Sequence, residues 1–254
     1  MMKMNISSAD DLDRVHEISF DAEALWSYIL TRIRAIGALD RIPLLTGFPD
    51  WALLRAFSDI DPEDTRLLAV VRDSAEYQTS LSLTGAAVSH VWLVASTDEL
   101  NAAISGFGDA SGHGLIFCPD DVAITSLSAH PPLPAIREAA EGGVLAIAAP
   151  PAQMARALTL RQSCAALGLQ PALIRVWQMF PVPAADLDAL LASYDALVIL
   201  DRPGSALAQG LSTWRLSSAL PLPVRTLAPD LSGEAMIDSL FTTATLGDRF
   251  EDPR

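Results

Sequence analysis

The chain has 254 residues, of which 50% are hydrophobic and 19% are charged, and its formal net charge at pH 7 is −14. This composition supplies enough apolar surface for a folded core and excludes a disordered chain. No apolar run approaches the roughly 18–20 residues needed to span a bilayer.

The charge and the cysteines narrow the classes of partner and cofactor. An acidic chain without a basic cluster is a poor match for nucleic acid or an anionic membrane, so we expect neither as a partner. Because the N-terminus turns acidic where a signal peptide would be apolar, we expect a cytoplasmic protein. Cys118 and Cys164 each lie in an apolar run, which indicates buried free thiols, and no paired spacing supports zinc ligation.

The first half of the chain predicts alternating strands and helices. Residues 1–18 are polar, which indicates irregular structure or a fringe helix. Apolar residues at helical spacing predict a helix from Phe20 to Ile36. Strands are predicted in 42–50, 65–73, 90–96 and 115–118, and helices in 51–57, 74–88 and 97–104. The glycine-rich segment 106–114 predicts a surface loop before the last of these strands.

Residues 142–227 give the clearest pattern in the chain. Strands are predicted in 142–150, 171–180, 196–200 and 223–227, with helices in 152–167 and 186–194 and a further helix before the last strand. Short apolar runs alternating with helix-length segments indicate βαβ units and a parallel sheet buried on both faces. We therefore predict an α/β protein with two three-layer αβα domains and mainly parallel sheets.

A proline cluster marks the expected domain boundary. Pro131, Pro132 and Pro134 lie in a segment that can continue neither a helix nor a strand ladder, which predicts an extended connector. We place the first domain at 1–120, the linker at 121–139 and the second domain at 140–254.

Most motifs have a structural explanation. The glycines of 106–114 precede a strand and so cannot aim helix N–H groups at a phosphate. Glu76 is predicted in the first turn of a helix, where the helix dipole alone favours an acid. His90 is interpreted as an exposed or hydrogen-bonded residue, whereas His113, between glycines, is a candidate to face a shared site. Trp92, Trp177 and Met179 are interpreted as packing residues.

Two stretches resemble one enzyme superfamily. In residues 72–96, a strand, a short acidic entry with Glu76, a helix ending in Gly-Ala-Ala and a second strand resemble the pyrimidine-binding module of thiamine diphosphate enzymes. From residue 142, the chain passes through a strand ending in Phe180–Pro181 to LDRPGSALAQG (200–210). This stretch is similar to the C-terminal domain of transketolases, 2-oxoacid dehydrogenase E1 β subunits and 2-oxoacid:ferredoxin oxidoreductases. Together the resemblances cover about residues 42–230.

The resemblance implies roles for individual residues. Glu76 would be catalytic and cofactor-binding, because in this family the corresponding glutamate hydrogen-bonds N1′ of the aminopyrimidine and promotes its imino tautomer. Such a role favours a buried carboxyl group with a raised pKa. Phe107 is the nearest candidate for the aromatic that stacks on the pyrimidine ring.

The resemblance also implies a partner chain. The Gly-Asp-Gly motif with a downstream Asn, which binds magnesium and diphosphate in the family, is not in this sequence; GDA at 108–110 is the nearest string. Magnesium and the diphosphate would therefore be held by an α-type partner subunit in a homo- or hetero-oligomer. The expected function is a β-type subunit of a split thiamine diphosphate enzyme, a transketolase or a 2-oxoacid dehydrogenase or oxidoreductase component, acting on a 2-oxoacid or ketose.

Two other functions remain open at this point. The chain could be a non-catalytic scaffold or assembly subunit that has lost the cofactor site. It could also be a small-molecule binding module that uses the carboxyl ends of its parallel strands.

Overall fold

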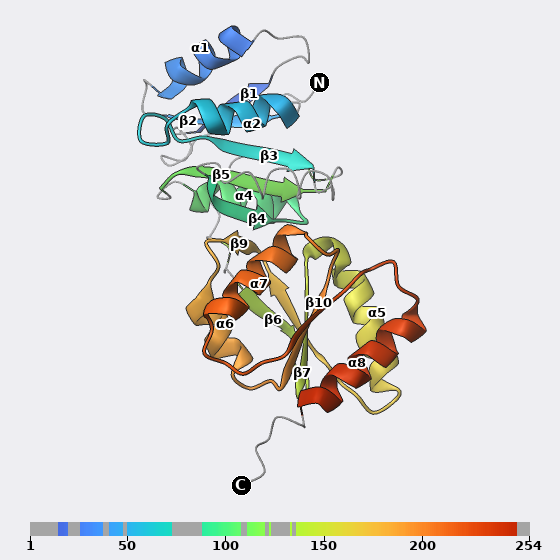
Figure 1. Cartoon of the computed structure of the whole chain (residues 1–254). Coiled ribbons are helices and arrows are strands. Elements are labelled where there is room, and N and C mark those ends of the chain that lie inside the picture. The colour runs from blue at the N-terminus through green and yellow to red at the C-terminus, as the bar shows by residue number, and fades with distance from the viewer. Residues whose placement is uncertain are drawn as a thin grey trace. The chain divides into compact units, whose positions relative to one another are not determined.

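The computed structural model describes residues 15–19, 26–37, 41–47, 50–72, 88–107, 111–119, 122, 133 and 136–247. The chain divides into two compact units, Met1–Leu133 and Pro134–Arg254. Each unit contains a mainly parallel sheet flanked by helices (Figure 1). The predicted fold class, two α/β domains with mainly parallel sheets, is confirmed. The boundary between the units falls inside the segment predicted as a linker.

The first unit alternates strands and helices along its length. Its described elements are β1 (Val15–Ser19), α1 (Trp26–Gly37), β2 (Ile42–Thr46), α2 (Asp50–Asp59), β3 (Leu68–Arg72), β4 (Val88–Leu93), α4 (Thr97–Gly106) and β5 (His113–Cys118). These strands lie in the order β1-β2-β3-β5-β4, and each neighbouring pair is parallel. The sheet therefore has one edge at which all of its described strands end.

The two faces of this sheet carry different helices. Alternate residues of the strands, among them Leu44, Leu68 and Ile116, are buried in one cluster with side chains of α4. On the other face, the ring of Phe57 from α2 lies 5.5 Å from the ring of His113 on β5. The sheet is thus covered on both sides, which accounts for its almost continuously apolar strands.

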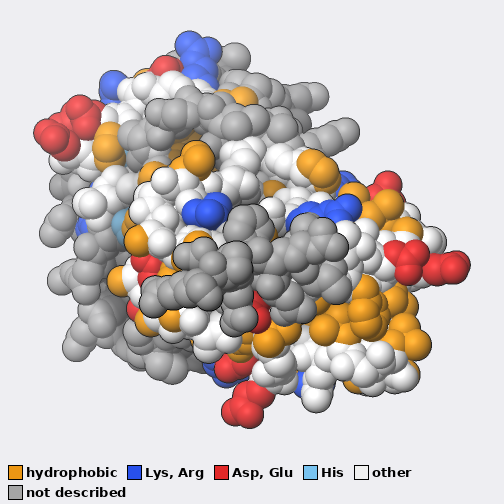
Figure 2. Space-filling model, turned by 60° about the horizontal axis from the view of Figure 1, so that its bottom comes forward, with side chains coloured by type: hydrophobic (Ala, Val, Ile, Leu, Met, Phe, Trp, Pro, Cys, Tyr) orange, Lys and Arg blue, Asp and Glu red, His pale blue; other side chains and the backbone are white. Residues whose placement is uncertain are grey.

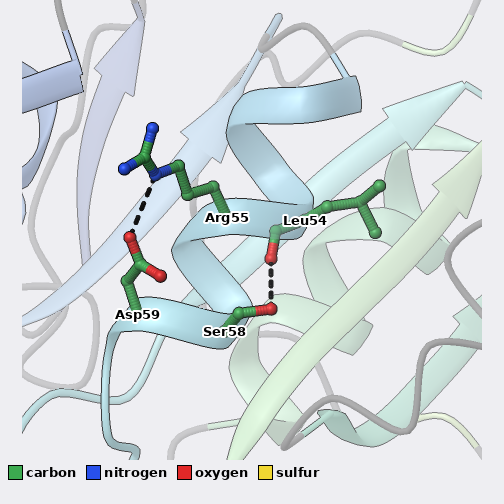
Figure 3. A network of polar contacts seen from close by, with 4 residues as sticks. All are labelled: Leu54, Arg55, Ser58 and Asp59. Atoms are coloured by element: carbon green, nitrogen blue, oxygen red, sulfur yellow. Dashed lines mark hydrogen bonds and ion pairs between the residues drawn. The ribbon is translucent and has the colours of Figure 1, made fainter.

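Helix α2 also has an exposed face, which is held by contacts four residues apart (Figure 3). Arg55 Nε donates to Asp59 Oδ2 at 3.1 Å, and Ser58 Oγ donates to the carbonyl of Leu54 at 2.9 Å. An exposed ion pair of this kind contributes only about 0.3–0.5 kcal/mol. The helix is therefore held mainly by its buried side chains Ala52, Leu53, Ala56 and Phe57.

The second unit repeats the three-layer plan. Its elements are β6 (Ile136–Ala140), β7 (Leu145–Ala149), the 3-10 helix η2 (Pro151–Gln153), α5 (Met154–Ala165), β8 (Ala172–Val176), β9 (Gln178–Phe180), α6 (Ala184–Leu191), β10 (Ala196–Leu200), α7 (Ala206–Ser217), β11 (Val224–Leu227) and α8 (Gly233–Gly247). The sheet order is β11-β10-β7-β8-β6. Strand β6 is antiparallel to β8, and the other pairs are parallel. Helices α5 and α8 cover one face, and α6 and α7 cover the other (Figure 1).

The structure corrects several sequence predictions. Residues 15–19 form β1, in place of the irregular or helical structure predicted for 1–18, because every residue of β1 pairs with β2. Strand β6 lies almost wholly within the predicted linker, and α8 was not predicted. The predicted strand 171–180 is interrupted at Trp177 and forms β8 and β9. Most of the predicted helix 74–88 lies outside the described residues.

None of the described helices combines the length and the apolar character needed to cross a bilayer.

Candidate functional site

At the carboxyl edge of the first sheet, β3 ends shortly before Glu76, the predicted cofactor residue, in the sequence. Arg72, the last residue of β3, pairs with Cys118, the last residue of β5, so these two strands end side by side. Strand β3 lies in the middle of the order β1-β2-β3-β5-β4. In open α/β sheets, ligands bind outside the carboxyl ends of the strands. The segment carrying Glu76 follows β3 directly, although Glu76 itself lies outside the described residues, and its role stays a prediction.

The end of β4 at the same edge is occupied by the start of α4. Ser96 is the N-cap of this helix, and its side chain accepts from the N–H of Glu99 at 3.3 Å. The Glu99 carboxylate in turn accepts from the N–H of Ala95 at 2.8 Å. This arrangement is a variant of the capping box in which Glu99 accepts from the residue before the N-cap, and with Asp98 it makes the first turn of α4 acidic. The helix start is therefore stabilised by its own side chains and is a poor anion site.

Phe107 lies at the opposite edge of the sheet. It is the C-cap of α4, and a Cβ added at Gly114 in β5 would lie 2.6 Å from its Cε2 atom. Gly114 pairs with Leu68, the first residue of β3, whereas Glu76 follows the last residue of that strand. At about 3.3 Å per residue, the length of β3 separates the Phe107 end of the sheet from Arg72, the last residue of the strand.

The ring of Phe107 is also enclosed. It is fully buried and packs edge-on against Trp92 at 6.0 Å and against His90 at 6.3 Å between ring centroids. Trp92 is itself buried, which agrees with its interpretation as a packing residue. Stacking of Phe107 on a pyrimidine would require the ring to leave this core, and that role stays a prediction.

His113 is a buried structural residue, not a loop residue facing a site. It is the first residue of β5 and is fully buried. Its Nδ1 accepts from the N–H of Leu67 at 3.1 Å, so its Nε2 carries the proton and donates to the carbonyl of Ile60 at 2.9 Å. Burial lowers the pKa of His113, while the bond to Ile60 and the charge of Asp61 oppose this effect. Both ring nitrogens are used in fixing the loop between α2 and β3.

His90 is likewise engaged in local contacts. Its Nδ1 lies 2.9 Å from Ser89 Oγ, and its ring stacks on Trp92 with centroids 5.4 Å apart. Burial lowers its pKa, and a hydrogen bond to the carbonyl of Ser111 raises it. These contacts agree with the prediction of a hydrogen-bonded residue.

In the second unit, the stretch LDRPGSALAQG forms the turn from β10 into α7. Asp201 is buried, and its Oδ1 accepts from the N–H of Arg202 at 2.8 Å. Gly204 has a φ of +83°, which favours glycine, and Ser205 is the N-cap of α7, accepting from the N–H of Ala208 at 3.1 Å. The sequence pattern used for the resemblance therefore encodes a strand-to-helix turn.

The surface shows no segregation of charge on the face drawn in Figure 2. Basic and acidic side chains of the described residues are scattered among one another there, and hydrophobic side chains gather in one area. Across the described residues, the exposed large hydrophobic side chains are Val144, Leu158, Leu167, Phe180, Leu216 and Leu231.

Comparison with known proteins identifies the fold. No protein-family model matches the sequence, and no curated protein matches it either. Solved structures do match, and they show that the chain shares its fold with a split-gene transketolase and with a 2-oxoglutarate:ferredoxin oxidoreductase. The resemblance predicted from the sequence is thus confirmed at the level of the fold.

Two of these structures are informative. A split-gene transketolase, an inactive β4 tetramer, matches with a TM-score of 0.64 and 16% identity over 88% of this chain and 79% of that chain. The 2-oxoglutarate:ferredoxin oxidoreductase from Magnetococcus marinus, with 2-oxoglutarate, coenzyme A and succinyl-CoA bound, matches with a TM-score of 0.56 and 11% identity. The second match covers 89% of this chain and 56% of the oxidoreductase chain.

Proposed function

We propose that this chain is the β-type subunit of a split thiamine diphosphate-dependent enzyme that acts on a 2-oxoacid or a ketose in the cytoplasm. The observation that carries the proposal is the match of 88% of the chain, across both units, to a split-gene transketolase. That neighbour is an inactive tetramer of β chains alone. Its inactivity supports the expectation that the present chain needs a second type of subunit.

Glu76 is the residue of this chain that would act on the cofactor. The segment that carries it leaves the carboxyl end of β3, in the middle of the sheet, which is a suitable place for a ligand-binding acid. A carboxyl group at N1′ would hold the proton that the imino tautomer requires. When bound, thiamine diphosphate supplies the nucleophilic carbon that attacks the substrate carbonyl. An α-type partner subunit would hold the magnesium ion and the diphosphate.

The proposal is tested by reconstituting the chain with a candidate partner that carries the Gly-Asp-Gly motif and the spaced asparagine. Thiamine diphosphate binding is measured by calorimetry, and turnover is measured with 2-oxoacids and ketose phosphates. We expect the Glu76→Gln variant to lose about 10²–10⁴-fold in turnover, the range typical of a proton-transferring side chain. Glu63→Gln is the matched control, because Glu63 is an exposed glutamate of the same unit.

Two results would reject this assignment. One is cofactor binding and turnover that are unchanged by Glu76→Gln. The other is a reconstituted complex that binds no thiamine diphosphate.

The burial of Phe107 favours a second candidate, a non-catalytic scaffold or assembly subunit. The candidate stacking aromatic is enclosed in the core at the amino-terminal edge of the sheet, a position that does not favour stacking on a cofactor. A scaffold of this kind would form a stable complex with the partner that binds no cofactor, whereas the enzyme would form a complex that does. Sedimentation analysis with and without thiamine diphosphate distinguishes the two.

A further inference from the structure

The side chain of His113 holds both ends of one loop. Residues 60–67 connect the end of α2 to the start of β3. At the first end of this loop the carbonyl of Ile60 accepts from Nε2 of the ring at 2.9 Å, and at the last end the N–H of Leu67 donates to Nδ1 at 3.1 Å. The two ring nitrogens of a single residue on β5 therefore fix the entry and the exit of the loop.

Leu67 is held by two consecutive residues of β5. Its N–H donates to the ring of His113, and its carbonyl accepts from the N–H of Gly114 at 2.8 Å. Because Leu67 directly precedes β3, these bonds also fix the amino end of that strand. The His113 ring supplies the bond that depends on its protonation state, since the backbone bond to Gly114 does not titrate.

The middle of the loop is held by local bonds. The N–H groups of Asp64 and Thr65 donate to the carbonyl of Asp61 at 3.0 and 2.9 Å, and the N–H of Glu63 donates to the Asp61 carboxylate at 2.9 Å. Asp61, Glu63 and Asp64 are exposed. A segment of this kind opens at a lower free energy than the central strands of a sheet. The loop can therefore detach while the sheet stays folded.

The surroundings of the ring favour its neutral form. The ring is fully buried and lies 5.5 Å from the ring of Phe57, which is the group that α2 presents to it. On the loop, the charge of Asp61 acts on the ring. Ser89 of β4 donates to the backbone carbonyl of His113 at 3.3 Å. Burial outweighs the bond to Ile60 and the charge of Asp61, and it lowers the pKa of His113.

We propose that His113 is an acid-sensitive latch, which holds residues 60–67 against β5 when the ring is neutral and releases them when it is protonated. Protonation places an Nδ1–H donor against the N–H donor of Leu67, so that bond is lost. A charged ring without its partner is costly in the core, and opening of the loop gives it access to water. The latch lies within the first unit and does not depend on the role proposed for Glu76.

Hydrogen–deuterium exchange of the full chain tests this proposal. It is measured by mass spectrometry at about pH 7.5 and about pH 5.5, one unit above and one unit below 6.5. Rates are divided by those of an unstructured chain at the same pH, which gives protection factors for residues 60–67 and, as references, for residues 115–117 of β5 and 196–200 of β10. His113→Gln removes the titrating ring. His90→Gln is the matched control, because the ring of His90 contacts Trp92 on the other face of the sheet.

In the wild type, acidification should lower the protection of residues 60–67 by up to about tenfold, because the open loop takes up one proton on a group that titrates near 6.5. The reference strands should change less, and His90→Gln should behave as the wild type does. His113→Gln should show no such fall in the loop. The proposal is overturned if loop protection in the wild type is the same at both pH values, or if it falls by the same factor as in residues 115–117. A fall that persists in His113→Gln also overturns it. The comparison of two pH values in the wild type stands even if a variant does not fold.

Discussion

The stability of the first unit should depend on pH through His113. This side chain is fully buried and uses both ring nitrogens, accepting from Leu67 and donating to Ile60. Only the neutral ring can do both, because protonation converts Nδ1 from an acceptor into a donor that faces another donor. Burial is the main cause of its lowered pKa.

The sign of the dependence follows from this lowered pKa. In the unfolded chain His113 titrates near 6.5, and in the folded chain it titrates below that value. Between the two pKa values the unfolded state binds more protons, so the free energy of unfolding rises with pH. The contribution is fully present above pH 6.5 and is lost as the pH falls towards the folded-state pKa. The loss is at most about 1.4 kcal/mol per pH unit for one proton.

Urea unfolding of the wild type and of His113→Gln, at pH values on both sides of 6.5, measures this contribution. Glutamine can donate and accept but does not titrate, so the variant should lose less stability on acidification than the wild type. At neutral pH we expect it to be about 1–3 kcal/mol less stable, because an amide does not reproduce both bonds of the ring. Equal losses of unfolding free energy in the two proteins over this interval would refute the argument.

Three further perturbations test the packing. Gly114→Ala should destabilise the chain by about 1–3 kcal/mol in urea unfolding, since its Cβ would overlap the ring of Phe107, and no loss would mean that the ring moves freely. Asp188→Ala should cost about 1–3 kcal/mol, because the buried indole N–H of Trp214 loses its acceptor at 2.9 Å; Asp188→Asn, which keeps an oxygen, should cost less. Burial and the carboxylate of Glu138 raise the pKa of Tyr194 to about 12, so alkaline titration by ultraviolet absorbance should show one tyrosine ionising late, and that step should vanish in Tyr194→Phe.

The local sequence pattern was sufficient to predict a strand where that strand is buried on both faces of its sheet. Strands β7 and β10 are fully buried, and their apolar runs stand out from the flanking turns. Strands β1 and β6 were missed because they carry polar residues and obtain their structure from pairing with a neighbour. A pairing partner distant in sequence leaves no local signal.

In the candidate site, too, some positions could be predicted from the sequence and others could not. The place of the Glu76 segment after β3 could be read from the sequence. The position of Phe107 at the amino edge of the sheet follows from the geometry of crossover helices, which the sequence prediction did not use. A crossover helix carries the chain from the carboxyl edge of a parallel sheet back to its amino edge, so a residue between α4 and β5 must lie at the amino edge. The ring contacts of His113 could not be predicted, because they join it to Ile60 and Leu67, which lie far from it in the sequence.

The order of strands in the two sheets has a consequence for how the chain folds during its synthesis. In the first sheet, β5 lies between β3 and β4, and in the second, β8 lies between β7 and β6. In both cases the central strand leaves the ribosome after the two strands that flank it. The flanking strands therefore cannot complete their pairing until the central strand has been made, and β6 has no neighbour in its sheet until residues 172–176 have been made. A nascent chain arrested before Ala172 would leave β6 and one side of β7 without their partner strand, available for pairing with other extended segments.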